Sequence, residues 1–144
     1  MLAPKRHSSG MQTLSSLSPQ VIIHLAAALA AAVLGPFALW ARLSSKQRPK
    51  LHRAFGYAWV TMMLISAISA AFIHSHFPQW WRFSWIHLLI PVTLFGLLGA
   101  FWFLAKGNIR GHRKTMLGLY FGACLGAGVF TLLPGRFLGQ FIWG

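Results

Sequence analysis

A run without charged residues at 21–41 reads VIIHLAAALAAAVLGPFALWA, and it sets the expectations for the whole chain. A helix needs about 20 apolar residues to cross the hydrocarbon core of a bilayer, and this run is long enough. Three further apolar runs without Lys, Arg, Asp or Glu follow at 54–73, 86–105 and 115–133. A single run would fit a signal anchor, whereas four in series predict a multi-pass membrane protein. We therefore expect an all-α fold, a bundle of four transmembrane helices.

The charge composition excludes several classes of function. The 144 residues include 13 Lys and Arg but no Asp or Glu, which gives a formal net charge of +13. Without carboxylates the chain has no carboxylate acid or base and no ligand set suited to Ca²⁺ or Mg²⁺. The counter-charges must come from lipid phosphates, from cofactor carboxylates or from a partner protein. Nucleic acid is not an expected partner, because the basic residues form no stripe interleaved with aromatic residues.

The basic residues predict the orientation of the four spans. Nine of them follow the first and third runs, namely Arg42, Lys46, Arg48, Lys50, Arg53, Lys106, Arg110, Arg113 and Lys114. Only Arg82 lies between the second and third runs, and only Arg136 follows the fourth. The positive-inside rule places the two basic loops in the cytoplasm and both termini outside. Residues 1–18 are predicted to be a flexible polar tail, followed by one domain over 19–144.

Two pairs of histidines recur at matching places along the chain. His24 near the start of the first run returns as His87 near the start of the third, and His52-Arg53 returns as His112-Arg113. We interpret this pattern as a duplicated helical hairpin with parallel repeats. Each pair would then lie at one depth, His24 and His87 near the outer face and His52 and His112 near the inner face. In an up-down bundle the members of each pair are diagonal across the core.

Histidines that face each other across a bundle are typical axial ligands of haem. His24 with His87 and His52 with His112 are therefore candidate ligands of b-type haem, and Arg53 and Arg113 could pair with haem propionates. Because the chain lacks carboxylates, a backbone carbonyl would have to orient each imidazole. Other interpretations stay open. The histidines could hydrogen-bond a neighbouring carbonyl or hydroxyl, form a proton or quinone site, or, at the interface, contact lipid headgroups.

Two further patterns suggest a metal site and a packing surface. His74 and His76 end the second run and are weak candidate ligands for Zn²⁺ or copper, since imidazole suits both. Gly118, Gly122 and Gly126 recur at every fourth position in the fourth run, and such glycines let a second helix approach closely. The alanine-rich first span is the expected neighbour of this glycine face, and another subunit is the alternative.

Three segments carry a resemblance to a known family. They are GNIRGHRKTM at 107–116, TLLPGR at 131–136 and HRAFGYAW at 52–59. Together they resemble a bacterial family of predicted membrane proteins, domain of unknown function 2306, over roughly 20–144. The resemblance implies a four-span protein of the bacterial cytoplasmic membrane and little about activity. The recurrent histidines also make the layout similar to small di-haem cytochromes of the b561 type.

These observations favour one function and leave one main alternative, while a small transporter or channel is a third interpretation that rests only on the four spans. The chain is expected to be a small membrane protein for electron transfer, linked to b-type haem or to a quinone. The alternative is a non-catalytic accessory subunit of a larger respiratory or photosynthetic complex, in which anionic lipids and the other subunits supply the missing negative charge.

Overall fold

The computed structural model describes residues 16–73, 85–134, 139 and 142–143, and over these residues it contains helices and no strand. The elements are α2 (Pro19–Leu43), α3 (Pro49–Phe72), the short 3₁₀ helix η1 (Trp85–Leu88), α4 (Leu89–Ala105), α5 (Ile109–Gly118), the π-helical segment η2 (Leu119–Leu125) and α6 (Gly126–Thr131). Each of the four predicted runs contains helix. The fourth is divided into α5, η2 and α6.

Local sequence explains where the helices begin and end. Pro19 and Pro49 occupy the first positions of α2 and α3, where a missing N–H costs nothing. Asn108 caps α5 by accepting a hydrogen bond of 2.9 Å from the Gly111 backbone N–H. Gly107 follows α4 with a φ of +71°, a left-handed conformation that glycine adopts without strain.

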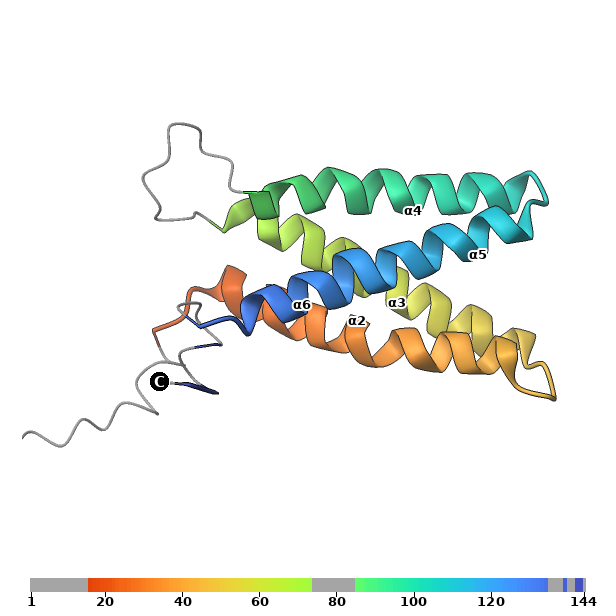
Figure 1. Cartoon of the computed structure of the whole chain (residues 1–144), viewed down its shortest axis with the longest axis horizontal. Coiled ribbons are helices and arrows are strands. Elements are labelled where there is room, and N and C mark those ends of the chain that lie inside the picture. Colours follow the sequence, from red (N-terminus) through yellow and green to blue (C-terminus); the bar gives the residue numbers. More distant parts are fainter. Residues whose placement is uncertain (1–15, 74–84, 135–138, 140–141, 144) are drawn as a thin grey trace, which may run out of the picture.

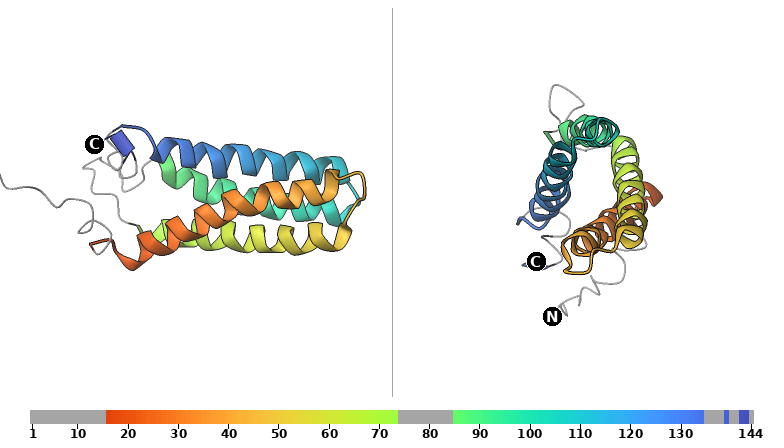
Figure 2. Two further views of the ribbon diagram at one scale, coloured as in Figure 1. Left: turned by 90° about the horizontal axis from the view of Figure 1, so that it is seen from below. Right: turned by 90° about the vertical axis from the view of Figure 1, so that its right-hand side faces the viewer.

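The helices form two hairpins that close into a ring (Figures 1 and 2). Helix α2 packs on α3, α3 on α4, α4 on α5 and η2, and η2 on α2. The diagonal elements are therefore α2 with α4, and α3 with the α5–η2–α6 course. We call the end that carries the two connections at 44–48 and 106–108 the turn end, which lies on the right in Figure 1. Figure 1 shows the two connections well separated there.

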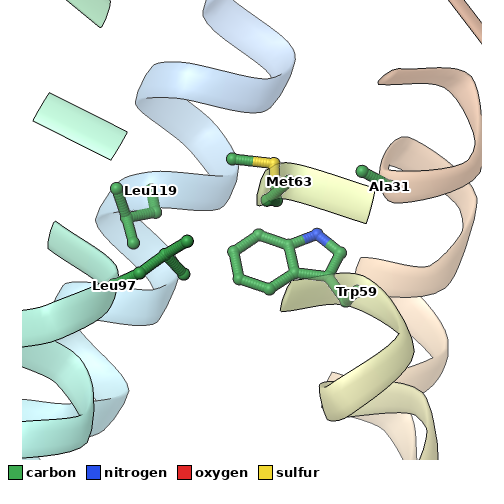
Figure 3. Close-up of a cluster of buried hydrophobic side chains, with 5 residues drawn as sticks. All are labelled: Ala31, Trp59, Met63, Leu97 and Leu119. Carbon is green, nitrogen blue, oxygen red and sulfur yellow. The ribbon is translucent and has the colours of Figure 1, made fainter. Parts of the chain in front are cut away.

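The buried core lies near the middle of the bundle and joins the two hairpins. It consists of Ala31 from α2, Trp59 and Met63 from α3, Leu97 from α4 and Leu119 from η2. Figure 3 shows the benzene edge of Trp59 directed toward Leu97 and Leu119, and its nitrogen edge toward Ala31. One aromatic side chain thus contacts both hairpins.

The outside of the bundle is apolar. Many of its large hydrophobic side chains are exposed, among them Phe95, Leu98 and Val129. In water such a surface would favour aggregation, whereas in a bilayer it faces lipid tails. Helices α2 and α3 are long and apolar enough to cross a membrane, and α4 is a shorter apolar helix.

A proline inside α2 creates a polar contact between the hairpins. Pro36 has no N–H, so it cannot donate to the carbonyl of Ala32 one turn earlier. The hydroxyl of Tyr120 in η2 donates to this carbonyl at 3.1 Å. A free carbonyl inside an apolar bundle is costly, so this bond both satisfies α2 and attaches it to η2. Pro91 lies in the first turn of α4, where no interior hydrogen bond is lost.

The bond from Tyr120 can be tested with the other tyrosine of the chain as control. We expect Tyr120→Phe to lower stability by about 1 kcal/mol, because the Ala32 carbonyl loses its partner in an apolar setting. Tyr57 is exposed, so Tyr57→Phe should leave the apparent Tm in detergent unchanged. Equal melting temperatures for the two variants would show that the hydroxyl of Tyr120 does not join the hairpins.

Candidate functional site

His52 lies one turn inside α3 at the turn end and is held by the neighbouring helix. Its Nδ1 lies 2.9 Å from the backbone carbonyl oxygen of Ala38 in α2. A carbonyl can only accept, so Nδ1 carries the proton and donates it. The bond connects the two helices of the first hairpin and fixes the plane of the imidazole ring.

His112 repeats this arrangement in the second hairpin. It lies in α5, and its Nδ1 donates to the backbone carbonyl of Ala100 in α4, also at 2.9 Å. The donors His52 and His112 are 60 positions apart and the acceptors Ala38 and Ala100 are 62 apart, so the bonds occupy corresponding places in the two hairpins. Each hairpin therefore has one histidine side chain that joins its two helices.

The hydrogen bonds to the backbone carbonyls determine which nitrogen of each imidazole ring carries the lone pair. In a neutral imidazole with its proton on Nδ1, the other nitrogen, Nε2, carries the lone pair. A ring held in this way is oriented for metal ligation, and a backbone carbonyl is a common partner for the ring nitrogen that does not bind the metal. Backbone carbonyls thus act as the hydrogen-bond acceptors that orient the rings, a role that carboxylates often have in other proteins.

The two histidines lie on the core-facing sides of their helices. Seven residues are about two helical turns, so His52 shares a face with buried Trp59, and His112 shares a face with buried Leu119. Helices α3 and α5 are on opposite sides of the ring. The structure therefore places His52 and His112 at the turn end of diagonal elements, roughly 10 Å along each helix from the buried core.

His24 is bonded differently, within a group of hydroxyls in α2 and α3. Its Nδ1 donates to the Ser66 carbonyl at 2.9 Å and lies 3.2 Å from Ser66 Oγ and 3.5 Å from Ser69 Oγ. Ser69 Oγ donates to the backbone carbonyl of Ile65 at 2.7 Å. His24 therefore connects the hairpin at the end opposite the turns and also presents Nε2. Its predicted partner, His87, lies partly buried in η1.

The remaining predicted site residues are placed as follows. Arg53 and Arg113, each next to a turn-end histidine, are exposed. None of the three hydrogen bonds made by His24, His52 and His112 joins the members of a predicted pair. Across 16–73, 85–134 and the few residues described beyond, no three His, Cys, Asp or Glu side chains lie close enough to hold a metal ion. The proposed metal ligands His74 and His76 fall outside the described residues.

Trp59 is a residue whose position the sequence did not reveal. Its side chain is 5% exposed, and its Nε1–H has no hydrogen-bond partner in the part of the chain that the structure describes. An unpaired buried donor costs about 1–3 kcal/mol, which makes this indole an unusual choice for a purely structural residue. The available signal was its spacing of two turns from His52, on the face that points into the bundle.

The glycine face of the fourth run is turned away from α2. Gly118, Gly122 and Gly126 are exposed, and an alanine Cβ at Gly118 or Gly122 would meet no atom within 4 Å. Contacts with the first span come instead from Tyr120, on the other side of η2. We expected these glycines to pack on the first span, and the structure does not show this contact. Packing against another subunit is the alternative that remains.

Comparison with known proteins identifies the family. A family model described as Predicted membrane protein (DUF2306) matches residues 21–142, most of the chain. Neither the curated proteins nor the solved structures include a significant match. The matched region contains all four helical courses and the histidines at 24, 52, 87 and 112. The chain therefore belongs to the DUF2306 family of predicted membrane proteins.

Proposed function

We propose that this membrane protein transfers electrons and binds a b-type haem at the turn end, with His52 and His112 as its axial ligands. The observation that carries the proposal is the matched pair of Nδ1 hydrogen bonds to the carbonyls of Ala38 and Ala100. These bonds give both rings the tautomer and the fixed orientation that an axial ligand needs. The two histidines lie on diagonal elements of the ring, so they would hold the haem from two different helices.

The surroundings of the two histidines fit a haem in two further respects. Trp59 and Leu119 are buried two turns deeper on the same helix faces, so they would separate the haem from the middle of the bundle. Arg53 and Arg113 are exposed beside the ligands and could pair with the two propionates. The propionates would also supply negative charge to a chain that has no Asp or Glu.

In this proposal the chain holds and orients the cofactor, and the haem iron supplies one-electron chemistry when it is bound. The backbone carbonyls keep the proton of each imidazole on Nδ1. The apolar exterior keeps the protein within the bilayer, where a lipid-soluble quinone is the class of redox partner that can reach it. We place the site at the turn end because the bonds of His52 and His112 match each other on diagonal elements, whereas His24 is bonded within a group of hydroxyls at the other end.

Haem binding can be tested with protein purified in mild detergent. We expect haemin to bind saturably at about one equivalent per chain, with a shift of the Soret band, because two oriented imidazoles complete the coordination of the iron. Non-saturable uptake that resembles partitioning into empty detergent micelles would refute the proposal. The same titration on protein unfolded in denaturing detergent provides the control.

A second candidate function is that of an accessory subunit in a larger membrane complex. The open glycine face of Gly118, Gly122 and Gly126 favours it, because glycines at this spacing let a foreign helix approach closely. The test is migration after mild extraction from the native membrane. A large assembly that is lost in a Gly122→Leu variant would support this role, whereas migration as a single small species would exclude it.

A further inference from the structure

The two hairpin connections at the turn end carry an unbalanced group of positive charge. Helix ends and connections there present nine basic side chains, Arg42, Lys46, Arg48, Lys50, Arg53, Lys106, Arg110, Arg113 and Lys114, and all nine are exposed. The whole chain has no Asp or Glu, so no side chain can neutralise them. The negative partner of this surface must therefore come from outside the chain.

Each connection also holds one cation over an exposed indole. The Arg48 guanidinium carbon lies 5.3 Å from the centre of the Trp40 ring in the first hairpin, and Lys106 Nζ lies 4.9 Å from the centre of the Trp102 ring in the second. These distances fit cation–π contacts. Trp40 and Trp102 lie in the last turns of α2 and α4 at corresponding places, 62 positions apart. A cation–π contact therefore occurs once in each hairpin, at corresponding positions.

The indoles indicate the level at which these cations lie. Trp40 is 49% exposed and Trp102 is 63% exposed, at the ends of apolar helices. Exposed indoles at the ends of membrane helices typically lie among lipid headgroups, because that region accommodates both an apolar ring and a polar N–H. A cation stacked on such a ring is held at the height of the lipid phosphates.

We infer that the turn end is a binding surface for the phosphates of anionic phospholipids, with Arg48 over Trp40 and Lys106 over Trp102 as two equivalent contact points. Polybasic segments beside a membrane helix are attracted to anionic lipid surfaces. The stacked geometry pre-orders two of the nine cations, which lowers the entropy cost of holding a phosphate. An acidic protein partner would satisfy the charge equally well, but it would not require the cations to lie level with exposed indoles. The inference does not depend on haem.

The test is the thermal stability of the detergent-purified chain with added lipid. Phosphatidylglycerol should raise the apparent Tm by at least about 3 °C more than phosphatidylcholine does, because the anionic lipid binds the folded state. Inorganic phosphate at the same phosphate concentration should give little of this gain, which distinguishes a lipid from a free anion. A high salt concentration should reduce the gain, since it screens exposed charges.

Charge-matched variants locate the effect. The double variant Arg48→Gln with Lys106→Gln should lose at least half of the phosphatidylglycerol gain. The variant Lys5→Gln with Arg6→Gln removes the same charge from the N-terminal tail and should keep the gain. Replacing Trp40 and Trp102 with Leu keeps every charge, and it should weaken the gain because the cations lose their positions.

Three outcomes would overturn the inference. They are a gain no larger with phosphatidylglycerol than with phosphatidylcholine, an equal gain with inorganic phosphate, and an equal loss in the tail variant. The first outcome would make an acidic protein partner the better candidate for this surface. None of these results bears on haem binding, which is read from a different signal.

Discussion

Replacing His52 with Asn is expected to remove the haem while the hairpin stays intact. The side-chain amide of Asn can donate to the Ala38 carbonyl from nearly the position of His Nδ1, so the contact between α2 and α3 is kept. Asn has no counterpart of Nε2, so the iron would lose one of its two protein ligands. We expect at least a roughly tenfold fall in haem bound per chain, with little change in the apparent Tm of the apoprotein. His112→Asn should behave in the same way, because its bond to Ala100 is equivalent.

The control for this experiment lies at the other end of the bundle. His24→Asn also removes an imidazole that is bonded to a carbonyl of the neighbouring helix. Because it is far from the turn end, the variant should bind haem as the unmodified protein does. If haem is retained in both turn-end variants, His52 and His112 are not the ligands and their bonds serve only to hold the hairpins. Loss in all three variants would point to a general defect in folding.

Replacing Gly35 with Ala is expected to loosen the contact between the two hairpins. An alanine Cβ there would lie 2.5 Å from Tyr120 Cε2 and 3.3 Å from Trp59 Nε1, and the Tyr120 ring is held in place by its bond to Ala32. The ring would have to move, and overpacking of this kind costs typically about 1–3 kcal/mol. The higher helix propensity of Ala would offset up to about 1 kcal/mol of this cost. The apparent Tm in detergent should therefore fall.

Gly99 provides a matched control for this substitution. It lies within α4, and an alanine Cβ there would meet nothing within 4 Å. Gly99→Ala should therefore keep or slightly raise the apparent Tm through helix propensity alone. A melting temperature for Gly35→Ala equal to that of Gly99→Ala would mean that Tyr120 and Trp59 do not pack against α2 as described.

The sequence predicted the helices better than it predicted their rotations. Apolar runs without charges located all four helical courses, because the length of such a run is a strong signal. The helices α3 and α5 begin five and six residues before the predicted runs, in the basic connections. The division of the fourth run by the π-helical segment at 119–125 was not foreseen, since no local composition marks it. The glycine spacing predicted a packing face against the first span, but a Cβ at Gly118 or Gly122 would meet no atom within 4 Å. Periodicity alone could not say whether this face pointed inward or outward.

For the candidate site, the sequence predicted the histidines but not their hydrogen-bond acceptors. Recurrence of His24, His52, His87 and His112 selected the histidines, and the lack of carboxylates implied that backbone carbonyls must orient them. The structure gives such a bond to His24, His52 and His112. The acceptors Ala38 and Ala100 could not be named beforehand, because they depend on how two helices of a hairpin are rotated against each other. The freed carbonyl at Ala32 was foreseeable from Pro36, but Tyr120 as its partner required the tertiary fold.

The most direct test of the haem proposal is a reduced-minus-oxidised visible spectrum of the full chain, purified in mild detergent from cells supplied with haem. We predict sharp α and Soret bands at about one haem per chain, with the spectral form of a low-spin iron that has two nitrogen ligands. A featureless spectrum from protein that was never exposed to denaturing detergent would contradict the proposal. It would leave His52 and His112 as structural contacts within the hairpins and the accessory-subunit role as the better account.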